Sequence, residues 1–261
     1  MPKILVHGHR GCRAVRPENT LPAFEHALKV GVDVLEVDLC VTADDVLVAS
    51  HDPLINEVIC QGSQTGVAIR SLTYAELQRY DCGSRRNPSF PHQVLVPGAR
   101  IPTLDAILRL GAPTKVWFNI ETKMRERPDL APPPEVFARR VLEAVRKHGV
   151  ASRTILQSFD YRSLRAMKKL DPSIRLSALD DRGQGDWVEL ARSAQAGIIS
   201  PRHDFVTPEK VRAAHQAGLE VVAWTANRPE DWRRLLEAGV DAIISDDPEP
   251  LIAYLQQRGL R

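Results

Sequence analysis

Apolar residues recur along this chain in two alternating patterns, and the alternation predicts the fold class. Short apolar runs of strand length are followed by longer stretches in which apolar residues return at the spacing of one helix face. The first such pair is a run at 4–9 and a helix at 20–30, which has Pro22 in its first turn and Gly31 as its stop. Further strands are predicted at 115–121, 154–158, 174–179, 197–200, 219–224 and 242–245, with helices at 104–110, 135–148, 161–170, 187–194, 208–217, 230–238 and 250–258.

A second strand and its hairpin complete the set of strand–helix units. Residues 34–41 and 46–48 are β-rich runs that the turn at 42–45 joins. Counted as one barrel strand with a hairpin extension, they bring the total to eight units. Eight such units in 261 residues predict an α/β protein with a (β/α)8 TIM-barrel fold.

The regular alternation breaks between residues 53 and 102. This segment is rich in Gly, Ser, Pro and Asn, and it carries one helical stretch near 73–80. A segment of about fifty residues does not easily build a core of its own. We therefore expect one domain over residues 1–261, with 53–102 as a small insertion after the second strand.

Composition and charge narrow the classes of function. With 43% hydrophobic and 26% charged residues, the chain is typical of a globular protein. Its 35 basic and 33 acidic residues give a net charge of +2, which is no electrostatic signature for binding nucleic acid. No apolar run has the length of a membrane span (~20 residues) or of a signal peptide. We expect a cytoplasmic protein with no nucleic-acid partner and no membrane span.

Four cysteines, at positions 12, 40, 60 and 82, lie far apart in the sequence. They form no Cys-x-x-Cys pair, the spacing that many zinc sites and thioredoxin-like centres use. The simplest interpretation is that all four are reduced thiols in a reducing compartment.

Carboxylates stand at the ends of two predicted strands, where TIM barrels carry their chemistry. Glu36 and Asp38 are two residues apart and therefore point to the same face of one strand, and Glu121 ends the next barrel strand. Paired with Arg10 or Lys123, these residues could be a salt-bridged barrel interior. They also form the all-oxygen ligand set that Mg²⁺ or Ca²⁺ accepts, and three carboxylates from adjacent strands favour the metal site.

Two histidines, His9 and His51, lie at predicted mouth positions of neighbouring elements. Imidazoles beside a metal can donate a proton to a leaving oxygen and accept one from a nucleophile near neutral pH. Arg10 and Lys123 add fixed positive charge for an anion. These residue types together favour a phosphate ester as substrate. His7, one strand step below His9, is expected to pack inside the barrel.

The same residues belong to an ordered set of motifs that spans nearly the whole chain. The motifs are His9-Arg-Gly11, Pro17-Glu-Asn-Thr20, Glu36-x-Asp38, Thr42-x-Asp44, His51-Asp52, Ile101-Pro-Thr-Leu104, Asn119-Ile-Glu121-x-Lys123, Ser158-Phe-Asp160, Trp224-Thr225 with Asn227, and Gly239-Val-Asp241 with Ser245-Asp-Asp-Pro248. In this order the set resembles the glycerophosphodiester phosphodiesterase family. The resemblance implies a metal-dependent hydrolase whose small-molecule substrate is a glycerophosphodiester, cleaved to an alcohol and glycerol 3-phosphate.

The resemblance also implies a cofactor and its ligands. Glu36, Asp38 and Glu121 would hold one divalent metal ion, with Mg²⁺, Ca²⁺ and Mn²⁺ as the candidates. In the mechanism usually drawn for the family, the glycerol 2-hydroxyl attacks phosphorus, and water then opens the cyclic phosphate.

The remaining implied roles fall on five residues. His9 and His51 would be the general acid and base, although the sequence does not show which acts first. Arg10 and Lys123 would bind the phosphate, and Trp224 would line the substrate pocket.

The chain departs from the family pattern at a few positions. One is mild, because the last strand ends in Ile-Ser-Asp at 244–246 instead of Ile-Thr-Asp. After His51-Asp52 the family usually shows Arg-Thr-Thr, whereas residues 54–58 here read Leu-Ile-Asn-Glu-Val. Asp45 stands where a glycine commonly closes the hairpin turn. These departures leave the catalytic set intact and leave the preferred alcohol open.

Two other functions stay open. One is a lysophospholipase D-like enzyme on the same barrel, for which the insertion would supply an apolar entrance from Phe90, Val94, Leu95 and Val96. The other is a catalytically silent barrel that binds a metabolite, because fold alone never fixes function.

Overall fold

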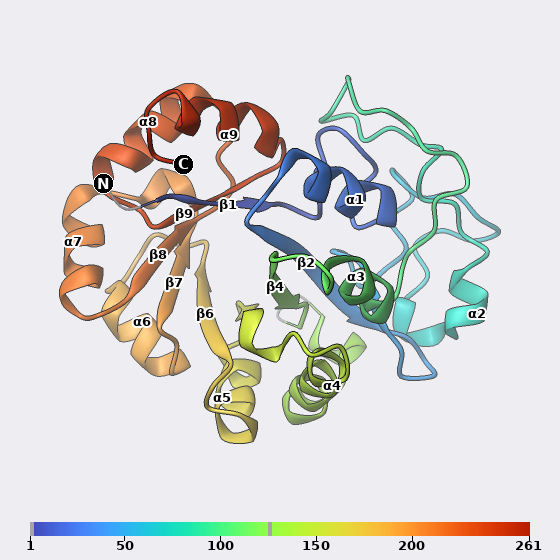
Figure 1. The fold of residues 1–261 in the computed structure, drawn as a ribbon. Coiled ribbons are helices and arrows are strands. Elements are labelled where there is room, and N and C mark those ends of the chain that lie inside the picture. Colours follow the sequence, from blue (N-terminus) through green and yellow to red (C-terminus); the bar gives the residue numbers. More distant parts are fainter. Residues whose placement is uncertain (1–2, 125–126) are drawn as a thin grey trace.

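Eight parallel strands close into a barrel at the centre of the molecule (Figure 1). The structure, a computed structural model, describes residues 3–124 and 127–261. The first strand pairs with the last on one side and with the second on the other, which closes the ring and confirms the predicted (β/α)8 barrel. The barrel strands are β1 (Leu5–Gly8), β2 (Val34–Val41), β4 (Trp117–Thr122), β5 (Thr154–Ser158), β6 (Arg175–Asp180), β7 (Ile198–Pro201), β8 (Glu220–Ala223) and β9 (Ala242–Ser245).

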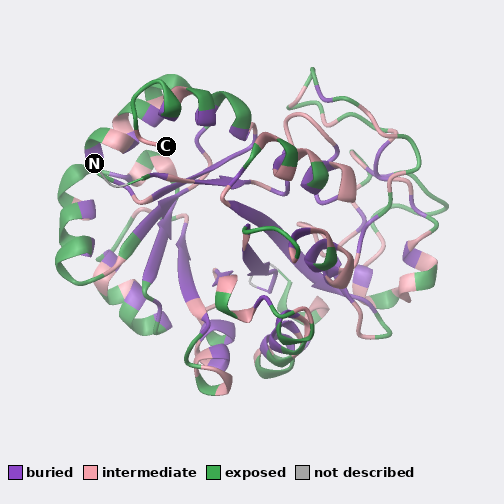
Figure 2. Ribbon diagram, viewed as in Figure 1, coloured by how far each residue is buried: buried purple, intermediate pink, exposed green. Residues whose placement is uncertain are grey.

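The helices other than α2 surround the barrel and bury one face each against it, while their outer faces are exposed (Figure 2). Side-chain caps set several helix starts, as at Thr103, Asp160 and Asp186. Among the described residues, no helix combines the length and the apolar character needed to cross a bilayer. The helices are α1 (Leu21–Val30), α2 (Tyr74–Leu77), α3 (Leu104–Gly111), α4 (Pro134–Lys147), α5 (Tyr161–Leu170), α6 (Trp187–Ala194), α7 (Pro208–Gln216), α8 (Pro229–Ala238) and α9 (Pro248–Gln256).

Side chains that point into the barrel change from apolar to polar along the strands. Because successive side chains alternate faces, β4 sends Trp117, Asn119 and Glu121 inward. The apolar floor of the barrel is a buried cluster made of Ile155, Ile198, Val222, Ala242 and Ile244. Polar side chains therefore gather at the C-terminal end of the strands, which is where TIM barrels carry their chemistry.

A short hairpin extends β2 beyond the ring. β3 (Leu47–Ala49) pairs with β2 in antiparallel register. In the turn, the Thr42 N–H donates to the Val46 carbonyl at 3.0 Å. Asp45 has a φ of 64°, in the left-handed region, which Asp adopts more readily than most residues, so the turn does not need a glycine. The hairpin returns the chain so that His51 lines the barrel mouth.

Residues 53–102 lie outside the barrel, beside the hairpin (Figure 1). Their one α-helix, α2, is shorter than predicted and begins with a capping box between Thr73 and Glu76. A small buried cluster joins this insertion to the hairpin, because Cys40 and Val48 of the hairpin belong to it. Its members are Cys40, Val48, Ile55, Cys60, Ile69, Leu77, Tyr80, Cys82 and Ile101.

Cys60 and Cys82 form a disulfide within the insertion. The expectation of four reduced thiols is therefore wrong for this pair, which is 22 residues apart in sequence but only 3.9 Å apart between Cα atoms. Cys12 and Cys40 are free and buried, and burial raises the pKa of both thiols. A high pKa keeps a thiol protonated, so these two cysteines are poor nucleophiles.

Candidate active site

Three buried carboxylates meet at the C-terminal end of the barrel. β2 carries Glu36 and Asp38, and Asp38 is the register partner of Glu121 on β4. One oxygen from each carboxylate lies within 4.8 Å of the other two. The residues are nearly closed to water, with relative exposures of 1%, 1% and 6%. The alternation of side chains along β2 and the parallel pairing with β4 together create this cluster.

Both oxygens of Glu36 accept hydrogen bonds. The backbone N–H of Arg10 donates to Oε2 at 2.9 Å, and the Gln157 Nε2 donates to Oε1 at 2.8 Å. Asn119 donates to the Gln157 Oε1 at 2.8 Å, and its Nδ2 lies 3.4 Å from the His7 Nδ1. A row of buried amides inside the barrel therefore fixes the direction of Glu36. His7 is buried, as the sequence predicted.

Asp38 is tied to the loop that follows β1. The Arg10 Nε lies 2.9 Å from the Asp38 Oδ2, and the Asn19 Nδ2 donates to the same oxygen at 3.0 Å. The loop turns sharply, with φ of 50° at Arg10 and 84° at Gly11. An added Cβ at Gly11 would meet the backbone of α1 at 2.6 Å. Glycine is therefore required here if Arg10 is to reach the carboxylates.

Lys123 contacts the carboxylates from the other side. Its Nζ donates to the Glu121 Oε1 at 2.8 Å and lies 4.0 Å from the Asp38 Oδ1. It also lies 5.8 Å from the centre of the Phe159 ring, which packs edge-on against Trp224 at 5.6 Å between centroids. Both cations predicted to bind phosphate, Arg10 and Lys123, thus pair directly with the carboxylates, and the two aromatic rings form an apolar wall beside Lys123.

In the cluster, three carboxylates lie beside two cationic side chains, Arg10 and Lys123. Burial raises the pKa of Glu36, and the charges of Asp38 and Glu121 raise it further. Burial likewise raises the pKa of Glu121. Burial also opposes ionisation of Asp38, but Arg10 beside it holds the pKa of Asp38 well below its usual range. A hard divalent cation would relieve the crowding of like charge, so this donor set fits a metal ion as well as it fits a salt-bridged interior.

His9 is oriented by a carboxylate from the last strand. Its Nδ1 lies 2.5 Å from the Asp246 Oδ1, and Asn227 donates to the Asp246 Oδ2 at 2.7 Å. Burial lowers the pKa of His9, and Arg10 lowers it further. Burial opposes ionisation of Asp246, yet His9 beside it holds the pKa of Asp246 at about 2. Near neutral pH, His9 is therefore an uncharged imidazole with Nδ1 held by an ionised carboxylate.

His51 repeats this arrangement on the other side of the mouth. Its Nδ1 lies 2.8 Å from the Asp52 Oδ1, and Asn56 donates to the Asp52 Oδ2 at 2.6 Å. The order imidazole, carboxylate and asparagine amide is the same as at His9. In both rings the partner on Nδ1 leaves Nε2 for exchange with a substrate.

Two cavities that share lining residues lie at this end of the barrel. A mouth pocket of about 60 Å³ is lined by both histidines, Glu121, Lys123 and Trp224 among other residues. A groove of about 710 Å³ shares His51 and Lys123 with the mouth pocket and is walled by residues 52–58 of the insertion. The mouth pocket can hold a reacting group, and the groove gives that group an exit toward the insertion.

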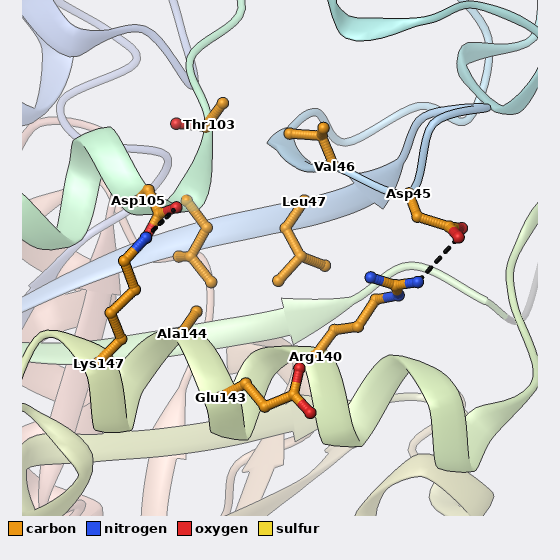
Figure 3. A pocket seen from close by; sticks show the side chains of 10 residues that line it. Asp45, Val46, Leu47, Thr103, Asp105, Arg140, Glu143, Ala144 and Lys147 are labelled. Atoms are coloured by element: carbon orange, nitrogen blue, oxygen red, sulfur yellow. Dashed lines mark hydrogen bonds and ion pairs between the residues drawn. The ribbon is translucent and has the colours of Figure 1, made fainter.

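A third hollow, of about 310 Å³, lies on the outer surface between the hairpin and α4 (Figure 3). Two pairs of oppositely charged side chains cross the gap. Arg140 lies 2.8 Å from Asp45, and Lys147 lies 3.1 Å from Asp105. The eight predicted site residues are absent from its lining, so it is separate from the barrel mouth.

All eight predicted site residues lie at the barrel mouth, and their chemical roles are taken up as proposals below. No role was assigned from the sequence to Gln157, Asn227 or Asp246. Nor was a role assigned to Asn19 or Asn56 as partners of carboxylates. The Gln157 contact crosses the barrel interior and the other contacts depend on loops, and residue spacing reports neither geometry.

A closed (β/α)8 barrel with an acidic cluster and two carboxylate-paired histidines at its C-terminal mouth has its polar residues where TIM-barrel enzymes carry their active sites. Residues 9–250 match the model of the glycerophosphoryl diester phosphodiesterase family. The chain belongs to that family.

Similar proteins align over almost the full length of the chain. A glycerophosphodiester phosphodiesterase from Caldanaerobacter subterraneus is 32% identical and covers 98% of this chain and 100% of its own. One from Bacillus altitudinis is 30% identical, with coverages of 97% and 98%. A crystal structure from Silicibacter pomeroyi, of a protein assigned as a glycerophosphoryl diester phosphodiesterase, has a TM-score of 0.91 at 31% identity and covers 99% of this chain and 95% of its own.

Proposed function

We propose that this protein hydrolyses glycerophosphodiesters to an alcohol and glycerol 3-phosphate, with a divalent metal ion and two histidines. One observation carries the proposal. Glu36, Asp38 and Glu121 bring oxygens within 4.8 Å of one another, and His9 and His51 line the pocket beside them. Family membership supplies the substrate class.

Glu36, Asp38 and Glu121 would hold the metal ion, with Mg²⁺, Ca²⁺ and Mn²⁺ as the candidates. When bound, such an ion neutralises charge on the phosphate oxygens and orients the ester. Arg10 and Lys123, which both line the mouth pocket, would bind the phosphate. Trp224, packed on Phe159, would line the glyceryl side.

The two histidines divide the proton transfers. His9 would accept at Nε2 the proton of the attacking hydroxyl as the new P–O bond forms. His51 would donate a proton from Nε2 to the alcohol oxygen as the old P–O bond breaks. The positions of the two histidines support this assignment of acid and base. His51 lines the groove, through which the alcohol would leave, and His9 does not. In the second step water would attack the phosphorus of the cyclic phosphate while His51 accepts its proton. The P–O bond to the glycerol 2-oxygen would break as His9 returns its proton to that oxygen, which leaves glycerol 3-phosphate and restores both histidines.

A coupled assay for free glycerol 3-phosphate tests the function. Its substrates are glycerophosphocholine, glycerophosphoethanolamine, glycerophosphoglycerol and a lysophospholipid. We expect release from the glycerophosphodiesters, and His9→Ala should reduce turnover by roughly 10²–10⁴ with the fold retained by circular dichroism. Release of no glycerol 3-phosphate from any of the four would contradict the proposal.

A lysophospholipase D-like activity is the second candidate. The observation that favours it is the large groove with apolar side chains beside the mouth, including the exposed Val58. The groove does not lie where the sequence placed the apolar entrance. Its wall is formed by residues 52–58 and not by residues 90–96. The Phe90 ring packs against Arg13 instead, with 4.8 Å between the ring centroid and the guanidinium carbon. Cleavage of the lysophospholipid in the same assay would support this candidate.

Other expectations from the sequence stay predictions. These are the single domain over 1–261 with an insertion at 53–102, the absence of a nucleic-acid partner, and the cytoplasmic location. The Cys60–Cys82 disulfide is of a kind that persists mainly in oxidising compartments, so it gives no support to the cytoplasmic prediction. Cell fractionation with thiol labelling of Cys60 and Cys82 tests the location.

A further inference from the structure

The groove beside His51 is much larger than the mouth pocket itself, at about 710 Å³ against about 60 Å³. Small-molecule sites commonly enclose roughly 300–1,000 Å³, a range that includes the groove and excludes the mouth pocket. The two cavities share His51 and Lys123. The groove is therefore large enough to hold the part of a diester that the mouth pocket cannot.

The wall of the groove is held by its backbone. The Ile55 N–H donates to the Val67 carbonyl at 2.8 Å, and the Ile69 N–H donates to the Pro53 carbonyl at 2.9 Å. These bonds tie the segment after His51 to a second segment of the insertion. Exposed side chains on this wall can therefore be replaced without removing the bonds that hold it.

The accessible part of this wall carries both apolar side chains and an acidic side chain. Leu54 is half-buried and Val58 is 49% exposed, so both present aliphatic surface to the groove. Between them in sequence is Glu57, which is also exposed and lines the groove. Such a wall suits a ligand that has a short aliphatic body and a polar end.

The charges that line the groove are paired, with one exception among the described residues. Lys123 donates to Glu121 at 2.8 Å. Arg127 donates to Asp129 with two nitrogens, at 3.0 and 2.7 Å. The carboxylate of Glu57 has no hydrogen bond or ion pair within residues 3–124 and 127–261. The groove therefore offers a ligand one unpaired negative charge.

We propose that this groove binds the alcohol half of the substrate, and that Glu57 selects alcohols with a cationic nitrogen, the choline and ethanolamine class. Leu54 and Val58 contact the aliphatic carbons, and the Glu57 carboxylate pairs with the ammonium group. The proposal rests on the function proposed above, and it adds the class of alcohol. An exposed ion pair changes an affinity by up to about fivefold, which sets the size of the effect.

Steady-state kinetics on two substrates test this subsite. Glycerophosphocholine and glycerophosphoglycerol differ in the charge of the alcohol and share the glycerol 3-phosphate half. We expect the wild type to favour glycerophosphocholine in kcat/KM. Glu57→Gln should raise the KM for glycerophosphocholine about threefold to fivefold, leave its kcat unchanged, and leave glycerophosphoglycerol unaffected. Glu57→Lys should reverse the preference, because it places a like charge beside the ammonium.

The matched control is Glu143→Gln, an exposed glutamate on α4 that lines the separate hollow of Figure 3. It should match the wild type on both substrates. A ratio of kcat/KM that is the same in the wild type, Glu57→Gln and Glu57→Lys would overturn the subsite and leave the proposed function standing. Failure of the wild type to release glycerol 3-phosphate from either substrate would overturn the proposed function itself, and the subsite with it.

Discussion

At the scale of single residues, each histidine at the barrel mouth is held by a carboxylate, and an asparagine holds that carboxylate in turn. His9 and His51 each have a carboxylate on Nδ1, and each of those carboxylates accepts a hydrogen bond from an asparagine. Such outer contacts fix the tautomer and orientation of a catalytic imidazole. Because each imidazole is held in one orientation, the roles assigned to the two histidines can be separated by comparing variants of each on two substrates with different leaving groups.

An activated leaving group tests the assignment of His51 as the acid. A p-nitrophenyl ester of glycerol 3-phosphate loses a phenolate that needs no proton. His51→Ala should therefore lose roughly 10²–10⁴ in kcat on glycerophosphocholine and far less on the p-nitrophenyl ester. His9→Ala should be impaired on both substrates. Equal losses for His51→Ala on the two esters would contradict the assignment.

Gln157 is expected to act through Glu36. Its amide donates to the Glu36 Oε1, and Asn119 holds the amide in turn. Gln157→Leu should weaken Mn²⁺ binding about 10- to 100-fold by calorimetry, because residues that orient a metal ligand have effects of this size. Gln216→Leu, at an exposed position of α7, is the control. Unchanged Mn²⁺ affinity in Gln157→Leu would remove the residue from this role.

At the scale of elements, the disulfide fastens the insertion that walls the groove. It closes a loop over a sequence separation of 22 residues. A cross-link of this span restricts the unfolded chain and stabilises the fold by about 2–4 kcal/mol. The Cys60→Ser, Cys82→Ser double variant should lose that much free energy of unfolding in urea, and reductant should produce the same loss in the wild type. A double variant as stable as the oxidised wild type would contradict this role.

The alternation of strands and helices was predictable because each unit repeats one hydrophobic pattern. Element ends were less predictable. The predicted strand at 115–121 is β4, Trp117–Thr122, and the predicted last helix at 250–258 is α9, Pro248–Gln256. Capping and packing with neighbours set these ends, and a hydrophobic pattern carries little information about either.

The candidate site was predictable only in part. The cluster of Glu36, Asp38 and Glu121 follows from side-chain alternation and strand order, which the sequence contains. The Cys60–Cys82 bond and the unpaired carboxylate of Glu57 depend on how the insertion folds back on itself. The insertion has little regular structure, so its pattern did not predict these contacts.

At the scale of the whole molecule, His7 makes the stability of the barrel depend on pH. Burial lowers the pKa of His7 to about 3 from 6.5, with Asp33 opposing and Arg175 adding to the effect. Between these two pH values the unfolded chain binds a proton at His7 and the folded chain does not. Acidification through this window therefore favours unfolding, and below about pH 3 the effect of His7 is complete.

This dependence can be measured by urea unfolding from pH 7 to pH 3 in the presence of a chelator. The free energy of unfolding should fall by up to about 1.4 kcal/mol per pH unit in excess of the fall in His7→Asn. His92→Asn, at an exposed histidine of the insertion, should follow the wild type. Parallel curves for the wild type and His7→Asn would show that His7 is not a source of the acid sensitivity.

The central claim is that the carboxylate cluster holds a metal ion that hydrolysis of a glycerophosphodiester requires. The most direct measurement is release of glycerol 3-phosphate from glycerophosphocholine before chelation, in excess chelator, and after addition of Mg²⁺, Mn²⁺ or Ca²⁺. We expect release to stop in chelator and to return with at least one of these ions, and Glu36→Gln to stay inactive throughout. Full activity in excess chelator, or an active Glu36→Gln variant, would contradict the claim.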